Sequence, residues 1–301
     1  PICLVGIDLC SCYRDAGDHH RSVEVGQLAF DSAVAQGLAG TEDYYRLAAT
    51  LMWSYHEAGD LLHAATWAQS LIAEVETSGP AEGQGAIFWN AALIAEGLGR
   101  LEQALHLSQR ALARMGEGTN SRDLARLRVA TAVLMLSTEP PQVTEAWHTL
   151  QGARETIADL GSQADRAQWE NAAAVAQIHR GEIAEAEDLS ARAWRRVGAG
   201  DHSLATELLI SRGDVAVAGG RSTAARAHYR DARSRLGQVA PSRATARLWR
   251  ELGDRLRESG EAEDALECYE GALSASGIND RSVALRAAIR RHNPQVPEQR
   301  Q

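Results

Sequence analysis

Helix-breaking residues recur along this chain at a nearly constant interval. They are Gly17, Gly59, Gly99, Pro141, Gly181, Gly220 and Gly260, and successive members lie 42, 40, 42, 40, 39 and 40 residues apart. Each is followed, five residues later, by a small residue: Ser22, Ala64, Ala104, Ala146, Ala186, Ala225 and Ala265. A small side chain just after a turn lets the two helices of a hairpin approach closely. Self-similarity at a fixed period is the signature of a repeat solenoid, so the spacing predicts seven stacked helix hairpins.

The composition favours helices over strands. Hydrophobic residues make up 45% of the 301 residues, but aromatic residues only 5%, and alanine supplies much of the apolar share. Alanine is the strongest helix former, and runs of β-branched and aromatic residues are few. We therefore predict an all-α protein.

The boundaries of several segments can be predicted from breakers and caps. The first hairpin is expected over residues 4–35, and the fourth over 121–137 and 143–160, with two prolines in its turn. A short helix over 281–291 has the polar face expected of a C-terminal cap. The solenoid is predicted to span residues 1–292, and residues 293–301 to form a tail.

The clearest repeat lies near the end of the chain. One helical stripe is followed by a second across Gly260: Trp249, Leu252, Gly253 and Leu256, then Ala265, Tyr269 and Ala272. This resembles the tetratricopeptide repeat (TPR), with Leu256 in place of the usual tyrosine. The resemblance implies a right-handed superhelical solenoid of about seven hairpins. The period near 40 exceeds that family's 34-residue unit, so longer helices or loops are expected.

The last two repeats, residues 204–278, also look similar to the C-terminal TPR half of bacterial helix-turn-helix (XRE-type) transcription regulators. This resemblance implies a cytoplasmic sensor that binds a peptide or small signal and can form a homodimer. It also implies that DNA is bound only through an N-terminal domain preceding Pro1. The alternative is a free-standing TPR adaptor that assembles proteins.

In the TPR family the first helices of the hairpins line the concave groove. Carried over by position, the residues expected to bind a peptide, small signal or protein partner are Arg46, Trp53, His56, Trp89, Asn90, Arg128, Met135, Asn171, Asp214 and Arg250. Equivalent inward positions hold Leu93, Thr131, Gln168, Val175, Ile178, Glu207, Ile210, Arg247, Asp254 and Arg257. Tryptophan supplies rigid apolar contact, asparagine can pair with a peptide backbone, and arginine can hold a carboxylate. The alternative for Trp53 and Trp89 is packing between helices, whereas Trp67, Trp147 and Trp194 are assigned to packing.

Other features argue against catalysis, metal binding and nucleic-acid binding by the chain itself. The formal net charge is −9, which disfavours a general phosphate-binding surface. The sequence has no Lys, and we find no HExxH, GxSxG, Walker or CxxC motif. Cys3, Cys10 and Cys12 match no structural zinc spacing, so reduced, buried or half-buried thiols are expected. We predict no enzyme activity, no cofactor, no metal and no membrane span.

An arginine-rich stretch over residues 221–257 leaves two interpretations open. Arg226, Arg230 and Arg233 fall on one helix face. They could form a dock for an acidic partner or for another domain of the same protein, or they could form a solvated helix surface, and the solvated surface is favoured.

Overall fold

The computed structural model describes residues 2–116, 121–197, 202–239 and 241–276, and all regular structure in these ranges is helical. The helices are α1 (Ile2–Asp15), α2 (His19–Ala35), α3 (Glu42–Glu57), α4 (Leu61–Ser78), α5 (Ala81–Gly97), α6 (Leu101–Met115), α7 (Ser121–Leu136), α8 (Val143–Leu160), α9 (Gln163–Arg180), α10 (Ile183–Val197), α11 (His202–Ala218), α12 (Ser222–Leu236), α13 (Arg243–Glu258) and α14 (Ala262–Ala275). The predicted all-α repeat solenoid is confirmed. The expected cap helix 281–291 and the tail lie outside the described residues.

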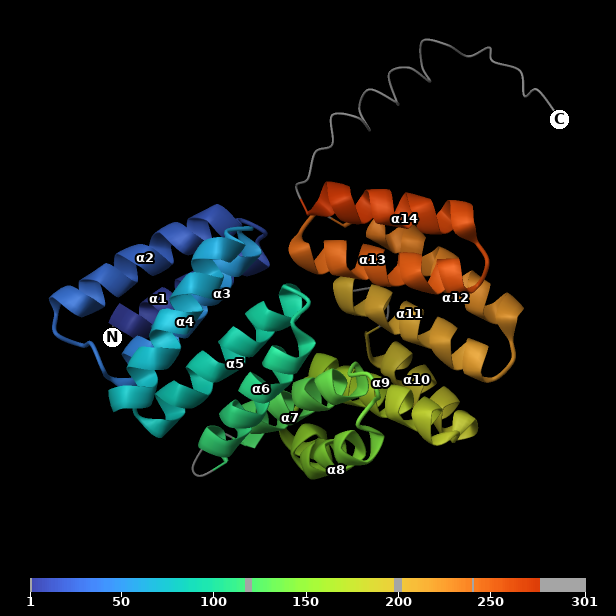
Figure 1. The fold of residues 1–301 in the computed structure, drawn as a ribbon, viewed down its shortest axis with the longest axis horizontal. Coiled ribbons are helices and arrows are strands. Elements are labelled where there is room, and N and C mark those ends of the chain that lie inside the picture. Colours follow the sequence, from blue (N-terminus) through green and yellow to red (C-terminus); the bar gives the residue numbers. More distant parts are fainter. Residues whose placement is uncertain (1, 117–120, 198–201, 240, 277–301) are drawn as a thin grey trace, which may run out of the picture.

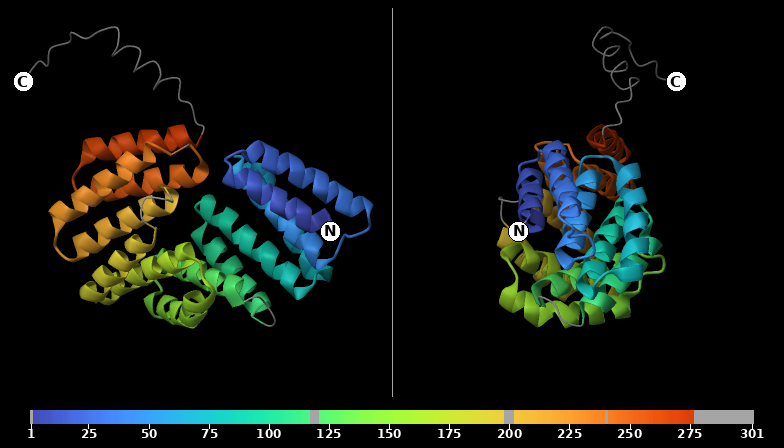
Figure 2. Two further views of the ribbon diagram at one scale, coloured as in Figure 1. Left: turned by 180° about the vertical axis from the view of Figure 1, so that it is seen from behind. Right: turned by 90° about the vertical axis from the view of Figure 1, so that its left-hand side faces the viewer.

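The helices pair in sequence order into seven antiparallel hairpins that follow one another round an arc (Figure 1). Each first helix packs on its own second helix and on the first helix of at least one neighbouring hairpin, as α3 does with α5. The arc curves so far that the last hairpin, α13–α14, returns beside the first three, and the back and side views agree with this arrangement (Figure 2). The two ends of the array are therefore near each other in space.

The glycines of the repeating turns adopt a conformation that other residues rarely reach. Gly17, Gly59, Gly99, Gly181, Gly220 and Gly260 all have φ between 71° and 90°. Positive φ costs glycine little because it has no Cβ, which explains why it recurs as the helix stop. The small residues five positions later are each at most 2% exposed, so they form the close contact inside each hairpin.

The fourth hairpin turns differently. Its helices α7 and α8 are separated by residues 137–142, which include Pro140 and Pro141. The backbone N–H of Gln142 donates to the carbonyl of Met135 at 2.9 Å, closing this longer turn without a positive-φ glycine. Helix α8 begins and ends where the sequence predicted, and α7 ends one residue earlier.

Two glycines inside helices allow a tyrosine to pack against the backbone. A Cβ on Gly213 would lie 2.1 Å from Cε1 of Tyr229, and a Cβ on Gly253 would lie 2.7 Å from Cε1 of Tyr269. In both hairpins the tyrosine hydroxyl donates to the aspartate that follows the glycine. These bonds run from Tyr229 to Asp214 at 2.7 Å and from Tyr269 to Asp254 at 2.8 Å. The repeat motif is therefore a packing device.

Arginine–carboxylate pairs join neighbouring second helices on the outside of the array. Arg226 pairs with Glu261 at 3.2 Å, and Arg233 pairs with Asp264 at 2.6 Å and with Glu267 at 3.0 Å. Two of the three arginines considered as a dock are thus engaged by the next hairpin. Such partly exposed pairs contribute roughly 0–1 kcal/mol each.

The core and the cysteines follow from the same packing. Trp67, Trp147 and Trp194 on second helices pack against the buried clusters. Cys3, Cys10 and Cys268 are buried free thiols, whereas Cys12 is exposed, contrary to the expectation of buried or half-buried thiols. Within the described ranges no helix combines the length and hydropathy needed to cross a bilayer.

Candidate ligand-binding groove

The first helices of the early hairpins hold their predicted groove residues in different ways. Arg46 on α3 is exposed and pairs with Asp43 at 3.5 Å. Trp53 is half-buried, and its ring stacks on the imidazole of His56 with centroids 4.6 Å apart. His56 is only 4% exposed, and its Nδ1 lies 3.4 Å from the carboxylate of Glu57.

On α5 the two predicted residues are half-buried. Trp89 packs against the core, and the guanidinium of Arg126 lies 5.8 Å from its ring centroid. The side-chain amide of Asn90 donates to the carbonyl of Ala86 at 3.0 Å, one turn earlier on the same helix. The Trp89 ring therefore already makes core packing contacts and a cation–π contact within the protein.

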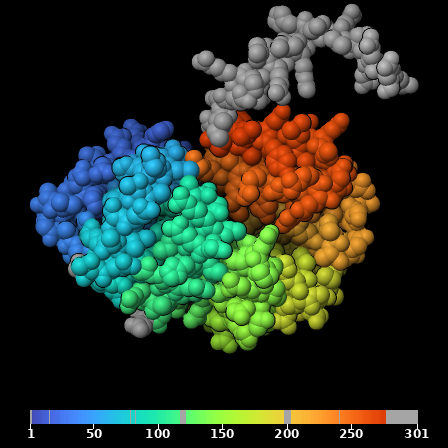
Figure 3. All heavy atoms as spheres, in the orientation of Figure 1, coloured from blue at the N-terminus to red at the C-terminus, as the bar shows by residue number. Residues whose placement is uncertain are grey.

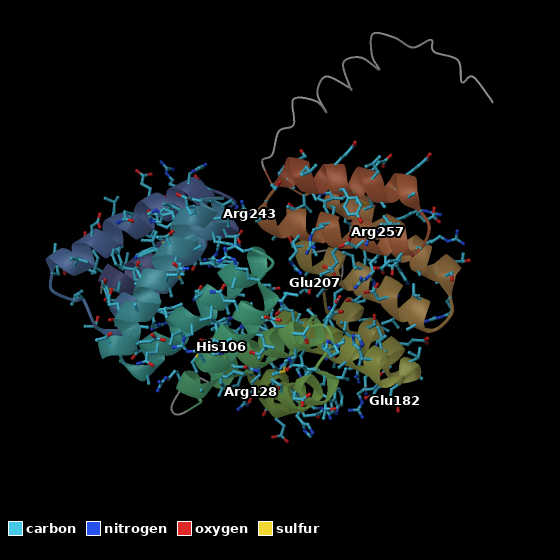
Figure 4. All side chains as sticks on the ribbon, viewed as in Figure 1. His106, Arg128, Glu182, Glu207, Arg243 and Arg257 are labelled. Carbon is cyan, nitrogen blue, oxygen red and sulfur yellow. The ribbon has the colours of Figure 1, made fainter. Side chains whose placement is uncertain are left out.

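The residues predicted on α7 turn toward their own hairpin. Arg128 donates to the carbonyl of Gly152 on α8 at 2.7 Å. Figure 4 shows Arg128 near α8. Met135 is 7% exposed and belongs to the core, where Thr149 donates to its sulfur at 3.9 Å.

Several predicted inward residues are covered by neighbouring helices. The covered residues are His56, Thr131, Met135, Asn171 and Ile210. The reason is that first helices also pack against one another, which covers positions that a single repeat leaves open. Asn171 and His56 differ from the other three, because the Oδ1 of Asn171 and both ring nitrogens of His56 are buried without a hydrogen-bond partner. A buried unpaired acceptor carries a desolvation cost of about 1–3 kcal/mol.

An open cavity of about 670 Å³ brings other predicted residues together. It is bounded by α9, α11, α12 and α13, and three of its lining residues were predicted as inward-facing: Val175, Ile178 and Asp214. Val217 and Ala218 continue the apolar wall, and Val217 is 50% exposed. Such a mixture of an apolar wall and a few polar groups is typical of a ligand pocket.

The polar end of this cavity is a fixed ion pair. Arg255 donates through Nε to both carboxylate oxygens of Asp214, at 2.9 and 3.0 Å, and Tyr229 donates to Oδ1. Burial raises the pKa of Asp214, and Arg255 and Tyr229 only partly oppose this rise. Burial, together with the neighbouring Asp214 charge, also raises the pKa of Tyr229. Because the pKa values of Tyr229 and Arg255 are both raised, both groups stay protonated at neutral pH and both donate to Asp214.

Sequence reasoning missed the part that Arg255 and Tyr229 play in this site. The signal was present, because glycine, aspartate and a later tyrosine recur at the same spacing in Gly213-Asp214 with Tyr229 and in Gly253-Asp254 with Tyr269. Arg250, by contrast, was predicted and is exposed on α13. It does not line the cavity.

No protein-family model matches the sequence, and no curated protein matches it. Several solved protein structures, however, match the fold of this chain. A Rap protein complexed with Competence and Sporulation Factor superposes with a TM-score of 0.66 and 11% identity, over 92% of this chain and 77% of that one. The Rap conjugation gene regulator of plasmid pLS20, in complex with the Phr* peptide, gives 0.62 and 11%, over 90% and 73%. A tetratricopeptide repeat protein from Parabacteroides merdae gives 0.56 and 18%, over 94% and 96%. This chain therefore shares the TPR fold with them.

Proposed function

We propose that the concave face of this array binds a peptide, or an extended segment of a partner protein, and that the cavity between α9, α11, α12 and α13 anchors it. The single observation that carries the proposal is this cavity, because it joins an exposed apolar wall to the Asp214–Arg255 ion pair on three successive first helices. An apolar side chain of the ligand would lie against Val175, Ile178 and Val217. The Asp214–Arg255 pair would orient its polar neighbours.

Two further observations support this proposal. The unpaired Oδ1 of Asn171 lies one turn before Val175 on α9, and a backbone N–H of a ligand would satisfy it after a small local movement. Two of the similar structures are complexes, one with Competence and Sporulation Factor and one with the Phr* peptide.

The binding experiment uses a matched pair of variants. A random heptapeptide phage library is selected on the immobilised protein, and the affinity of an enriched, fluorescein-labelled peptide is measured by anisotropy. Val217→Arg fills the cavity, and Val34→Arg makes the same change on α2, where the valine is 49% exposed. We expect Val217→Arg to weaken binding at least tenfold and Val34→Arg to leave it unchanged. Equal affinities for the two variants would remove the cavity from the proposal.

The cellular role that we propose is the sensor part of a bacterial transcription regulator acting in the cytoplasm. The likeness of residues 204–278 to such regulators supports this role. Its test is transcript profiling of the source cell with and without the selected peptide. Peptide-dependent changes should occur with the wild-type gene and disappear with Val217→Arg. A protein that binds the peptide but changes no transcript would instead be the adaptor.

A further inference from the structure

Three helix ends carry the charge that their own dipole disfavours. Helix α3 ends in Glu57, and α5 has Glu96 in a last turn that contains no basic residue. Helix α13 begins with Arg243, has Arg247 one turn later, and has no acidic residue in its first turn. Helix dipoles favour cations at C-terminal ends and anions at N-terminal ends, so each of these ends is unfavourable by itself.

The arc of the array places these ends opposite one another. The C-terminal ends of α3 and α5 point toward the N-terminal half of α13 (Figure 1). In the space-filling view, the last hairpin meets the second and third hairpins with little space between them (Figure 3). Figure 4 shows Arg243 at this junction and Glu207 toward the middle of the array.

The charges act on one another across the junction. Burial lowers the pKa of Arg243, and the Glu57 carboxylate opposes this change. Burial raises the pKa of Glu96; Arg247 and His56 oppose the rise, and Glu251 adds to it. Arg247 lies 3.8 Å from Glu207 and 3.6 Å from Glu251, and Glu96 contributes further negative potential from the other side of the groove. The carboxylates at the C-terminal ends of α3 and α5, which their own helix dipoles disfavour, thus attract the arginines at the N-terminal end of α13.

We propose that the N-terminal half of α13 is an intramolecular interaction surface whose partner is the paired C-terminal ends of α3 and α5, and that this contact latches the array into a nearly closed ring. Across this junction Arg243 interacts electrostatically with Glu57, and Arg247 interacts with Glu96 as well as with its ion-pair partners Glu207 and Glu251. The helix dipoles strengthen both contacts, because two partially negative ends meet one partially positive end. The latch joins residues about 150–190 positions apart, and it sets how widely the groove opens. It stands independently of what the groove binds.

The test measures the width of the junction in the full chain. Spin labels are placed on Cys12, the exposed native thiol, and on an introduced cysteine, Glu270→Cys, at an exposed position of α14. Electron–electron resonance gives the distance distribution between the labels. Neutralising one side (R243Q/R247Q) or the other (E57Q/E96Q) should shift this distribution to longer distances and broaden it. The quadruple variant should shift no further than either double variant, because the two sides act on each other.

The control removes the same number of charges from the same helix. R250Q/R257Q changes two other arginines of α13: Arg250 is exposed, and Arg257 pairs with Asp254 on its own helix, so the distribution should stay as in the wild type. Salt near 1 M, where the Debye length is about 3 Å, should open the wild type and leave the quadruple variant unchanged. This salt arm leaves every charged residue of the latch unsubstituted, so it decides the question even if a charge variant folds poorly. Equal distributions for R243Q/R247Q and R250Q/R257Q, or no salt response in the wild type, would refute the latch.

Discussion

Replacement of Gly213 by alanine tests the packing device of the repeat motif most directly. The added Cβ would lie 2.1 Å from Cε1 of Tyr229 and 2.6 Å from Cδ1 and Cζ, far below van der Waals contact. Tyr229 cannot swing away easily, because it is 1% exposed and its hydroxyl is bonded to Asp214. We therefore expect Gly213→Ala to destabilise the protein, although the same change stabilises most helices.

Two opposing effects set the magnitude. Alanine is more favourable than glycine in a helix interior by roughly 1 kcal/mol. Overpacking a filled site costs typically about 1–3 kcal/mol, and the severe overlap with Tyr229 places this site at the upper end. The net loss is then about 2 kcal/mol, which corresponds to a fall in melting temperature of roughly 3 °C, because an unfolding entropy of about 2.1 cal/mol/K per residue is summed over the whole chain.

Thermal and urea unfolding, followed by circular dichroism, would measure this loss. Gly253→Ala is the matched control, because Tyr269 is less buried and can yield, so its effect should be smaller. In a Tyr229→Ala background the obstruction is gone, and Gly213→Ala should become neutral or stabilising. An equal loss with and without the tyrosine ring would refute the packing argument.

Two further predictions concern titration. Burial raises the pKa of Asp165, but the hydrogen bonds from Ser162 and Arg122 outweigh it and hold the pKa below its usual value. The stability that this carboxylate adds is present above its unfolded pKa and is lost as the pH falls through the lowered folded pKa. The difference in urea midpoint between the wild type and Asp165→Asn should therefore become smaller from about pH 7 to about pH 3. A difference that stays constant over this range would contradict the prediction. Burial raises the pKa of Cys268 to about 12, and Cys3 and Cys10 are buried as well, whereas Cys12 is exposed. At about pH 8 Ellman's reagent should therefore modify Cys12 rapidly and the three buried thiols only after unfolding. Fast reaction of a second thiol in the native protein would contradict the burial.

Much of the fold could be predicted because it depends on short-range chemistry. A glycine that must adopt positive φ, and a small residue five positions later, act within one hairpin, so Gly59 with Ala64 and Gly220 with Ala225 are visible in the chain. The helix boundaries of the fourth hairpin follow from prolines in the same way. The assignment of Trp194 to packing is another local inference that the structure confirms.

The candidate site was only partly predictable. Val175, Ile178 and Asp214 were placed on the inward face and do line one cavity. Met135 and Ile210 were placed there too, yet they are buried, because the packing of one first helix on the next depends on the rotation between hairpins. That rotation is not encoded in any single repeat. The positions of the other predicted groove residues relative to a ligand remain predictions.

The sequence by itself determined that this chain forms stacked helix hairpins, since period, turns and packing glycines all act over fewer than about 40 residues. Only the tertiary structure decided which charges meet. Arg255 of the next hairpin pairs with Asp214, and Arg243 interacts electrostatically with Glu57, which lies five hairpin junctions earlier in the array. Small rotations at each junction add up along the solenoid, so contacts between its ends depend on a sum that no local pattern reveals.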